Sequence, residues 1–139
     1  MLPHSKSSRV EFYQSVAAHG GVAAADPQQL ILMLLDGALE RIAAARGAIE
    51  RGQVADKARL VHRVIAILDE LKASLNHDAG GALSQNLDQL YGYVQRQLLR
   101  GSAENRQELL AESIALLQEI RAAWIALPRD SAPVQNTAR

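Results

Sequence analysis

The sequence has no cysteine, no surplus of charge and no long apolar run, and each absence narrows the choice of function. Without cysteine there is no disulfide framework, thiolate chemistry or zinc–thiolate site. The 15 Lys and Arg residues balance 15 Asp and Glu residues, so nothing favours binding to nucleic acid or an anionic membrane. Because no stretch approaches about 18 consecutive apolar residues, and no apolar signal run opens the chain, we expect a cytoplasmic protein without membrane insertion.

Aromatic residues are scarce as well, at 4% of the chain, and β-branched residues do not alternate with polar ones. Both features argue against a β-sheet. A length of 139 residues is enough for one domain with a substantial core.

The stretch that begins at Asp26 predicts the helix around which the rest of the chain is organised. Asp26 can cap the first free N–H groups, and Pro27 suits the first helical position. One apolar seam repeats at alternating steps of four and three, as expected for packing on other helices: Ile31, Leu35, Ala38, Ile42, Ala45 and Ile49. A second apolar face lies about 100° round the helix, at Leu30, Met33, Gly37, Ala44 and Ala48. The first face predicts packing into the core of the domain. The second face needs a further partner that covers it.

Apolar periodicity and glycine-marked breaks predict four helices, at about 27–51, 54–76, 83–100 and 102–127. Short connections force antiparallel neighbours, so the expected fold is all-α: an antiparallel up-down four-helix bundle spanning residues 26–128. Residues 1–25 are expected to form a flexible N-terminal arm, and residues 129–139 a disordered tail.

The third predicted helix carries six residues expected to point inward: Leu83, Leu87, Leu90, Tyr91, Val94 and Leu98. The second has two adjacent seams, which are Val61, Ile65, Leu68 and Leu75, and Leu60, Val64, Ile67 and Leu71. Tyr93 points away from the inward side of the third helix, so its role stays open.

Four-helix bundles often hold metals, but the di-iron version needs inward Glu-x-x-His pairs, which this chain lacks. The histidines are scattered, and neither glycine pair is followed by the Lys-Ser/Thr of a phosphate loop. We therefore expect no metal, no cofactor and no enzymatic activity. One local cluster of basic residues is interpreted as a solvent-exposed helix face: Arg41, Lys57, Arg59, His62 and Arg63.

The residues alone thus predict a bundle with more apolar helix surface than its core uses. Such faces usually receive amphipathic segments in grooves, or another copy of the bundle. The N-terminal arm adds an apolar group of its own, at Phe12, Tyr13 and Val16.

The chain also resembles a known family, the flagellar secretion chaperones (FliS). The run from Pro27 to Leu39 is similar to that family's first-helix signature. Further similarities are Ser74-Leu75-Asn76, Gly80-Gly81, Asn86-Leu87-Asp88-Gln89-Leu90-Tyr91-x-Tyr93, Gln97-Leu98-Leu99 and Trp124. The likeness covers about Tyr13 to Leu127, with Leu35 where the family often has Tyr, and Asp26 where it usually has Ser or Thr.

The resemblance implies a cytosolic chaperone that works without ATP. Family members bind the disordered C-terminal segment of flagellin, which wraps along apolar grooves, and they deliver flagellin to the type III export apparatus. The N-terminal arm can cover part of the groove when flagellin is absent. Together with the apolar faces, this suggests the following contact residues: Phe12, Tyr13, Val16, Leu30, Met33, Leu34, Gly37, Leu60, Ile67, Leu71 and Tyr93. The alternative is a self-associating helical adaptor of the flagellar system without flagellin specificity. Either protein could also form a weak homodimer.

Overall fold

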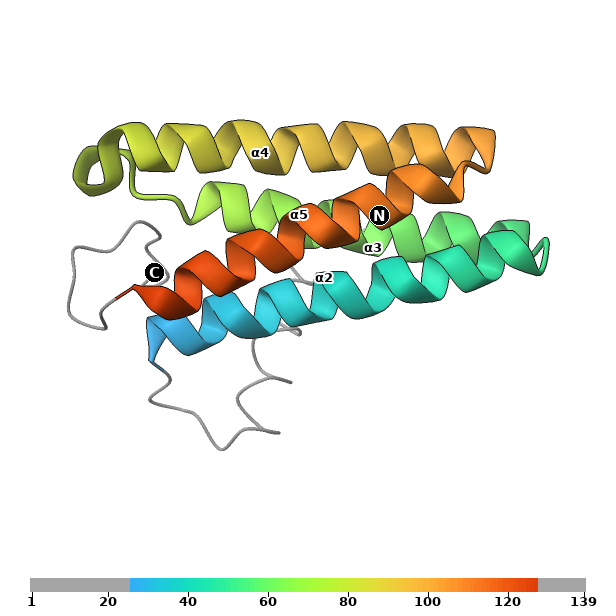
Figure 1. The fold of residues 1–139 in the computed structure, drawn as a ribbon, viewed down its shortest axis with the longest axis horizontal. Coiled ribbons are helices and arrows are strands. Elements are labelled where there is room, and N and C mark those ends of the chain that lie inside the picture. The colour runs from blue at the N-terminus through green and yellow to red at the C-terminus, as the bar shows by residue number, and fades with distance from the viewer. Residues whose placement is uncertain (1–25, 128–139) are drawn as a thin grey trace, which may run out of the picture.

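The structure is a computed structural model that describes residues 26–127. It contains four helices: α2 (Pro27–Glu50), α3 (Val54–Ala73), α4 (His77–Glu104) and α5 (Gln107–Ala126). Successive helices run in opposite directions (Figure 1), which confirms the predicted all-α, four-helix bundle. The predicted arm and tail lie outside the described residues.

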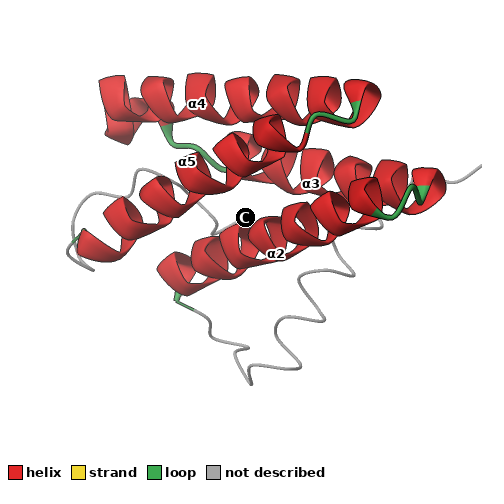
Figure 2. Ribbon diagram, turned by 45° about the vertical axis from the view of Figure 1, so that its right-hand side comes forward, coloured by secondary structure: helices red, strands yellow, loops and turns green. Residues whose placement is uncertain are grey.

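The helices pack as a closed ring. α2 contacts α3, α3 contacts α4, α4 contacts α5, and α5 returns to α2. Figures 1 and 2 show that α5 starts beside the end of α4 and then crosses the bundle, so that it finishes beside the start of α2. α4 and α5 therefore lie close together at one end of the bundle and apart at the other.

The start of α2 follows from its first residues, as predicted. The Asp26 carboxylate accepts a hydrogen bond from the Gln28 backbone N–H at 3.1 Å, and Pro27 occupies the first helical position. This satisfies one of the backbone donors that an uncapped helix would leave free.

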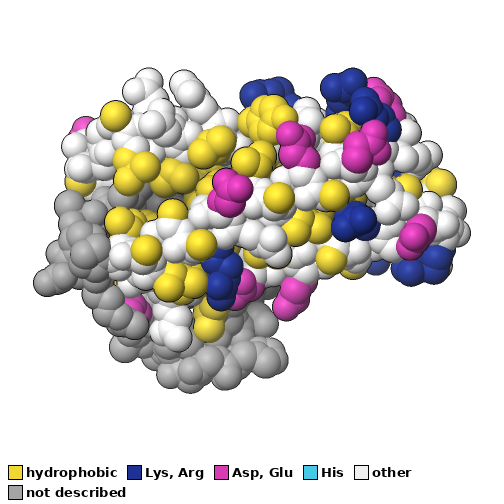
Figure 3. All heavy atoms as spheres, viewed as in Figure 1, with side chains coloured by type: hydrophobic (Ala, Val, Ile, Leu, Met, Phe, Trp, Pro, Cys, Tyr) yellow, Lys and Arg dark blue, Asp and Glu magenta, His cyan; other side chains and the backbone are white. Residues whose placement is uncertain are grey.

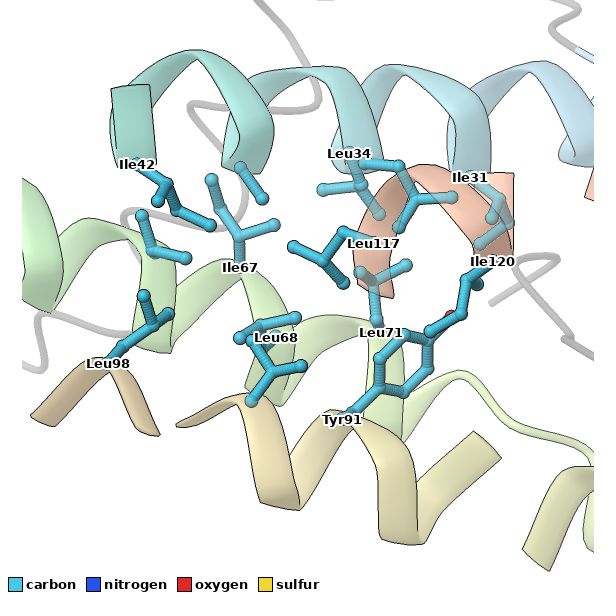
Figure 4. Close-up of a cluster of buried hydrophobic side chains, with 14 of the residues drawn as sticks. Ile31, Leu34, Ile42, Ile67, Leu68, Leu71, Tyr91, Leu98, Leu117 and Ile120 are labelled. Carbon is cyan, nitrogen blue, oxygen red and sulfur yellow. The ribbon is translucent and has the colours of Figure 1, made fainter. Parts of the chain in front are cut away.

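The core contains most of the predicted seam of α2, since Ile31, Leu35, Ala38, Ile42 and Ala45 are all fully buried. The Tyr91 ring is also fully buried, and it lies beside Leu71 and Ile120 in Figure 4. All four helices contribute side chains to this one apolar cluster.

The predicted boundary between the second and third helices is right in part. α3 ends at Ala73, and α4 already begins at His77, where the Asn76 side chain accepts from the Ala79 N–H at 3.0 Å. At Gly81 the backbone of α4 leaves the helical conformation, because its φ of 52° and ψ of −126° fall in a region that suits only glycine. The regular part of α4 therefore starts after the glycine pair, as predicted, and a short helical turn from His77 precedes it.

The predicted break at Gly101 is wrong. α4 continues through Gly101 to Glu104, Asn105 makes the turn in the left-handed conformation, and α5 begins at Gln107. A Cβ atom at Gly101 would lie 2.5 Å from Leu110 Cδ1. Glycine therefore occurs at this helical position because α5 packs closely against it, not because the helix stops there.

Candidate binding surfaces

The two flanks of α2 have different neighbours. Gln28 and Asp36 lie on one flank and bond to Trp124 and Arg121 of α5. Leu30 and Gly37 lie on the other flank, which by helical geometry faces α3, and Met33 lies at the outer edge of that flank. All three residues are half-buried.

The flanks of α3 divide in the same way. Asp69 and Lys72 bond to Gln95 of α4. The opposite flank faces α2 and carries three predicted contact residues, Leu60, Ile67 and Leu71. Six of the predicted contact residues therefore converge on one seam, between α2 and α3: Leu30, Met33, Gly37, Leu60, Ile67 and Leu71.

Some of the predicted contact residues belong to the core rather than to an open surface. Leu34 and Leu71 are 1% and 0% exposed, and Ile67 is 7% exposed. The inward face of each helix is broader than a two-position seam, because every helix packs against two others. The accessible part of the α2–α3 seam thus reduces to Leu30, Met33, Gly37 and Leu60.

Four predicted contact residues do not lie on this seam. Phe12, Tyr13 and Val16 fall outside the described residues. Tyr93 lies between α4 and α5, where its hydroxyl donates to Glu112 Oε2 at 2.9 Å. This hydrogen bond raises the pKa of Tyr93, because it stabilises the protonated phenol next to a carboxylate.

A second apolar surface lies where α4 and α5 separate, and the sequence reasoning missed it. Leu83 and Leu90, predicted to point inward, are 46% and 37% exposed. They share one flank of α4 with Tyr93 and with Leu87, which is half-buried. Hydrophobic side chains gather between the diverging halves of α4 and α5 in Figure 3.

α5 contributes the other side of this surface. Glu112 contacts α4, and Leu116 and Leu127 follow on the same flank of α5 at one and four helical turns. Both leucines are half-buried and pack on the core. We call this surface the α4–α5 opening and define it by Leu83, Leu87, Leu90, Leu116 and Leu127.

The exposure of these leucines has a geometric cause. The spacing of Leu83, Leu87 and Leu90 fits a helix stripe that packs on a neighbour, and the sequence pattern does not reveal that α5 turns away at this level. An apolar surface of this kind on a folded protein commonly marks a site of interaction.

The five residues of the predicted basic cluster do not all lie together in the structure. Lys57 is buried and donates to the Asn105 side chain at 2.9 Å, and Arg41 donates to the Gly37 carbonyl oxygen within α2. Arg59, His62 and Arg63 remain together on α3, beside a hollow of about 410 Å³.

Other kinds of site find no support in the described part of the chain. No group of His, Cys, Asp or Glu residues between 26 and 127 could hold a metal ion. None of the helices in this range combines the length and apolarity that crossing a bilayer requires.

Comparison with known proteins gives the family. A profile described as flagellar protein FliS matches residues 10–131. The flagellar secretion chaperone FliSB of Pseudomonas aeruginosa is 41% identical over 112 residues, which cover 81% of this chain and 89% of the relative. The flagellar secretion chaperone FliS of Salmonella typhimurium is 37% identical over 119 residues, or 85% of this chain and 88% of the relative. The FliS of Vibrio cholerae is 29% identical over 119 residues, or 86% and 88%. The chain therefore belongs to the FliS family of flagellar proteins.

Proposed function

We propose that this flagellar export chaperone binds the disordered C-terminal segment of flagellin in its apolar grooves. It keeps flagellin from polymerising too early in the cytoplasm and delivers it to the flagellar type III export apparatus. The relatives' names, flagellar secretion chaperones, support the export role. The observation that carries the binding role is the α4–α5 opening, where Leu83 and Leu90 are large, apolar and exposed.

An unfolded protein segment suits such a surface. A segment that folds into an amphipathic helix can place its apolar side against Leu83, Leu87 and Leu90, which lie in a row along one flank of α4. Fully burying a leucine contributes about 1.5–3 kcal/mol. Ordering the segment opposes this gain, so several leucines must act together.

The α2–α3 seam extends the available surface. Its accessible residues, Leu30, Met33, Gly37 and Leu60, lie on another side of the bundle, so a long segment has to wrap round the bundle to reach both surfaces. A disordered segment can do this, because it has no fold of its own to preserve.

The test is a calorimetric titration with a peptide that contains the C-terminal segment of the flagellin from the same organism. Leu90→Glu places a charge in the α4–α5 opening and should weaken binding about tenfold or more, which corresponds to about 1.4 kcal/mol. Leu99→Glu is the matched control, since Leu99 is 49% exposed but lies on the opposite flank of α4. Both variants should keep the helical circular dichroism and melting temperature of the natural protein.

Two results would contradict the proposal. The first is a flagellin peptide that does not bind the natural protein. The second is light scattering that shows two copies joined through the opening, with Leu90→Glu separating them and leaving peptide binding unchanged. That second result would favour the self-associating adaptor.

A further inference from the structure

Glu112 is held in a fixed position at the narrow end of the α4–α5 opening. Its Oε2 accepts from the Tyr93 hydroxyl at 2.9 Å, and its Oε1 accepts from Gln97 Nε2 at 3.0 Å. Both donors are neutral. Among the described residues no Lys or Arg forms an ion pair with Glu112, although other carboxylates of the bundle, such as Asp36, do have such partners.

The position of this carboxylate relates it to the apolar surface. Leu90 precedes Tyr93 by about one turn of α4, and Leu116 follows Glu112 by about one turn of α5. A segment that lies between the leucines of the two helices therefore passes the carboxylate where the helices converge. Glu112 itself is exposed, so its carboxylate is accessible to a partner.

We propose that Glu112 is a specificity-determining residue, which pairs with a Lys or Arg side chain of the segment bound in the α4–α5 opening. This inference rests on the proposed function, and it adds a charge requirement to a surface that is otherwise apolar. The apolar residues can bind any amphipathic segment. The carboxylate favours the register of the bound segment in which a Lys or Arg side chain lies at the narrow end of the α4–α5 opening.

The chemistry of the carboxylate supports this role. Each carboxylate oxygen has about two acceptor positions, so one bond from Tyr93 or Gln97 leaves room for a cationic donor. Because the two neutral donors already order Glu112, less side-chain entropy is lost when the ion pair forms. Charged groups at the edge of an interface act mainly on partner choice and register.

The contrasting explanation is that Tyr93, Gln97 and Glu112 only tie α4 to α5. Glu112→Gln separates the two explanations. A glutamine can accept from the Tyr93 hydroxyl and bond to the Gln97 amide, so it keeps the tie but removes the charge. Glu50→Gln is the matched control, because Glu50 is an exposed glutamate at the far end of α2.

The measurement is the affinity for the flagellin C-terminal peptide at about 0.05 M and about 0.5 M salt, where screening differs strongly. Glu112→Gln should weaken binding about two- to fivefold at low salt, as expected for an exposed ion pair, and the difference should shrink at high salt. Tyr93→Phe keeps the charge but removes one orienting donor, so its loss should be smaller. Glu50→Gln should change nothing.

Peptide variants locate the partner cation. Each Lys or Arg of the peptide is replaced by Gln in turn, and each is titrated against the natural protein and Glu112→Gln. One replacement should show a smaller effect on Glu112→Gln than on the natural protein, which is the mark of a direct pair. If Glu112→Gln binds as tightly as the natural protein at both salt concentrations, the inference is wrong while the proposed function stands. If the natural protein does not bind the peptide, the proposed function itself fails.

Discussion

The Trp124 indole N–H donates to the Gln28 carbonyl oxygen at 3.1 Å, and the Gln28 side-chain amide donates back to the Trp124 carbonyl oxygen, also at 3.1 Å. This reciprocal pair joins the first turn of α2 to the last turn of α5. Further along the same interface Arg121 contacts Asp36 through two hydrogen bonds, at 2.6 and 3.3 Å. These polar contacts hold α5 against α2, and by doing so they keep its second half away from α4.

Removing the indole donor should therefore destabilise the bundle. Trp124→Phe keeps an aromatic ring but removes one of the two hydrogen bonds of the pair, and we expect a loss of about 0.5–1.5 kcal/mol in the free energy of unfolding. Urea denaturation followed by circular dichroism measures this change. Ile125→Ala is the control, since Ile125 is 51% exposed and should shift stability by less than about 0.5 kcal/mol. Equal stability of Trp124→Phe and the natural protein would show that the pair contributes nothing.

Two glycines inside helices should respond in opposite ways to alanine. Gly101→Ala places a Cβ 2.5 Å from Leu110 Cδ1 and 3.1 Å from the Arg106 carbonyl oxygen, so we expect a loss of about 1–3 kcal/mol. At Gly47 the nearest atom, at 3.0 Å, is the end of the flexible Arg51 side chain. Gly47→Ala should therefore gain up to about 1 kcal/mol from helix propensity. Thermal melts of both variants test this prediction, and a destabilised Gly47→Ala with an unchanged Gly101→Ala would contradict the close packing of α5 on Gly101.

A charge at the α2–α3 seam should affect binding more than folding. Met33 is half-buried beside Leu30 and Gly37, so Met33→Glu should weaken binding of the flagellin peptide about tenfold, a change of about 1.4 kcal/mol. Ala43→Glu adds the same charge on an exposed position of α2 and serves as the control. Unfolding of Met33→Glu would place Met33 in the core, and unchanged binding would remove this seam from the proposed site.

Alkaline pH should destabilise the protein through Tyr91. Burial raises the pKa of Tyr91 above its ordinary value of 10.0, because the interior disfavours the charged phenolate. The unfolded chain releases this proton from about pH 10, while the folded chain keeps it, so stability is fully present below pH 10 and falls as the pH rises further. Urea midpoints between pH 8 and 11, on the natural protein and Tyr91→Phe, measure the effect. The variant should lose less stability over this range, and parallel curves would contradict the prediction.

The sequence by itself determined the class and order of the elements. Asp26 and Pro27 set the start of α2, and the repeat from Ile31 to Ala45 set its buried face, because capping and helical periodicity are local properties. The burial of Tyr91 also followed from its place among the apolar residues of α4. Neither conclusion requires knowing which residues far apart in the chain come into contact.

The ends of α3 and α4 depended on tertiary contacts that cannot be read from the sequence. Glycine at position 101 is typical of a helix end, yet Gly101 lies inside α4. The close approach of Leu110 requires a residue without a side chain there. Gly81, by contrast, does interrupt the helix, since its backbone is not helical. Glycine therefore marked both places correctly without revealing which role it has in each.

Only the tertiary structure decided which apolar faces stay accessible. Leu34, Ile67 and Leu71 are covered because each helix packs on two neighbours, whereas Leu83 and Leu90 are exposed because α5 leaves α4 to meet α2. Periodicity gives the direction of a side chain around its own helix, but not whether another helix lies in that direction. That depends on the angles at which the helices cross, which are fixed by packing across the whole bundle.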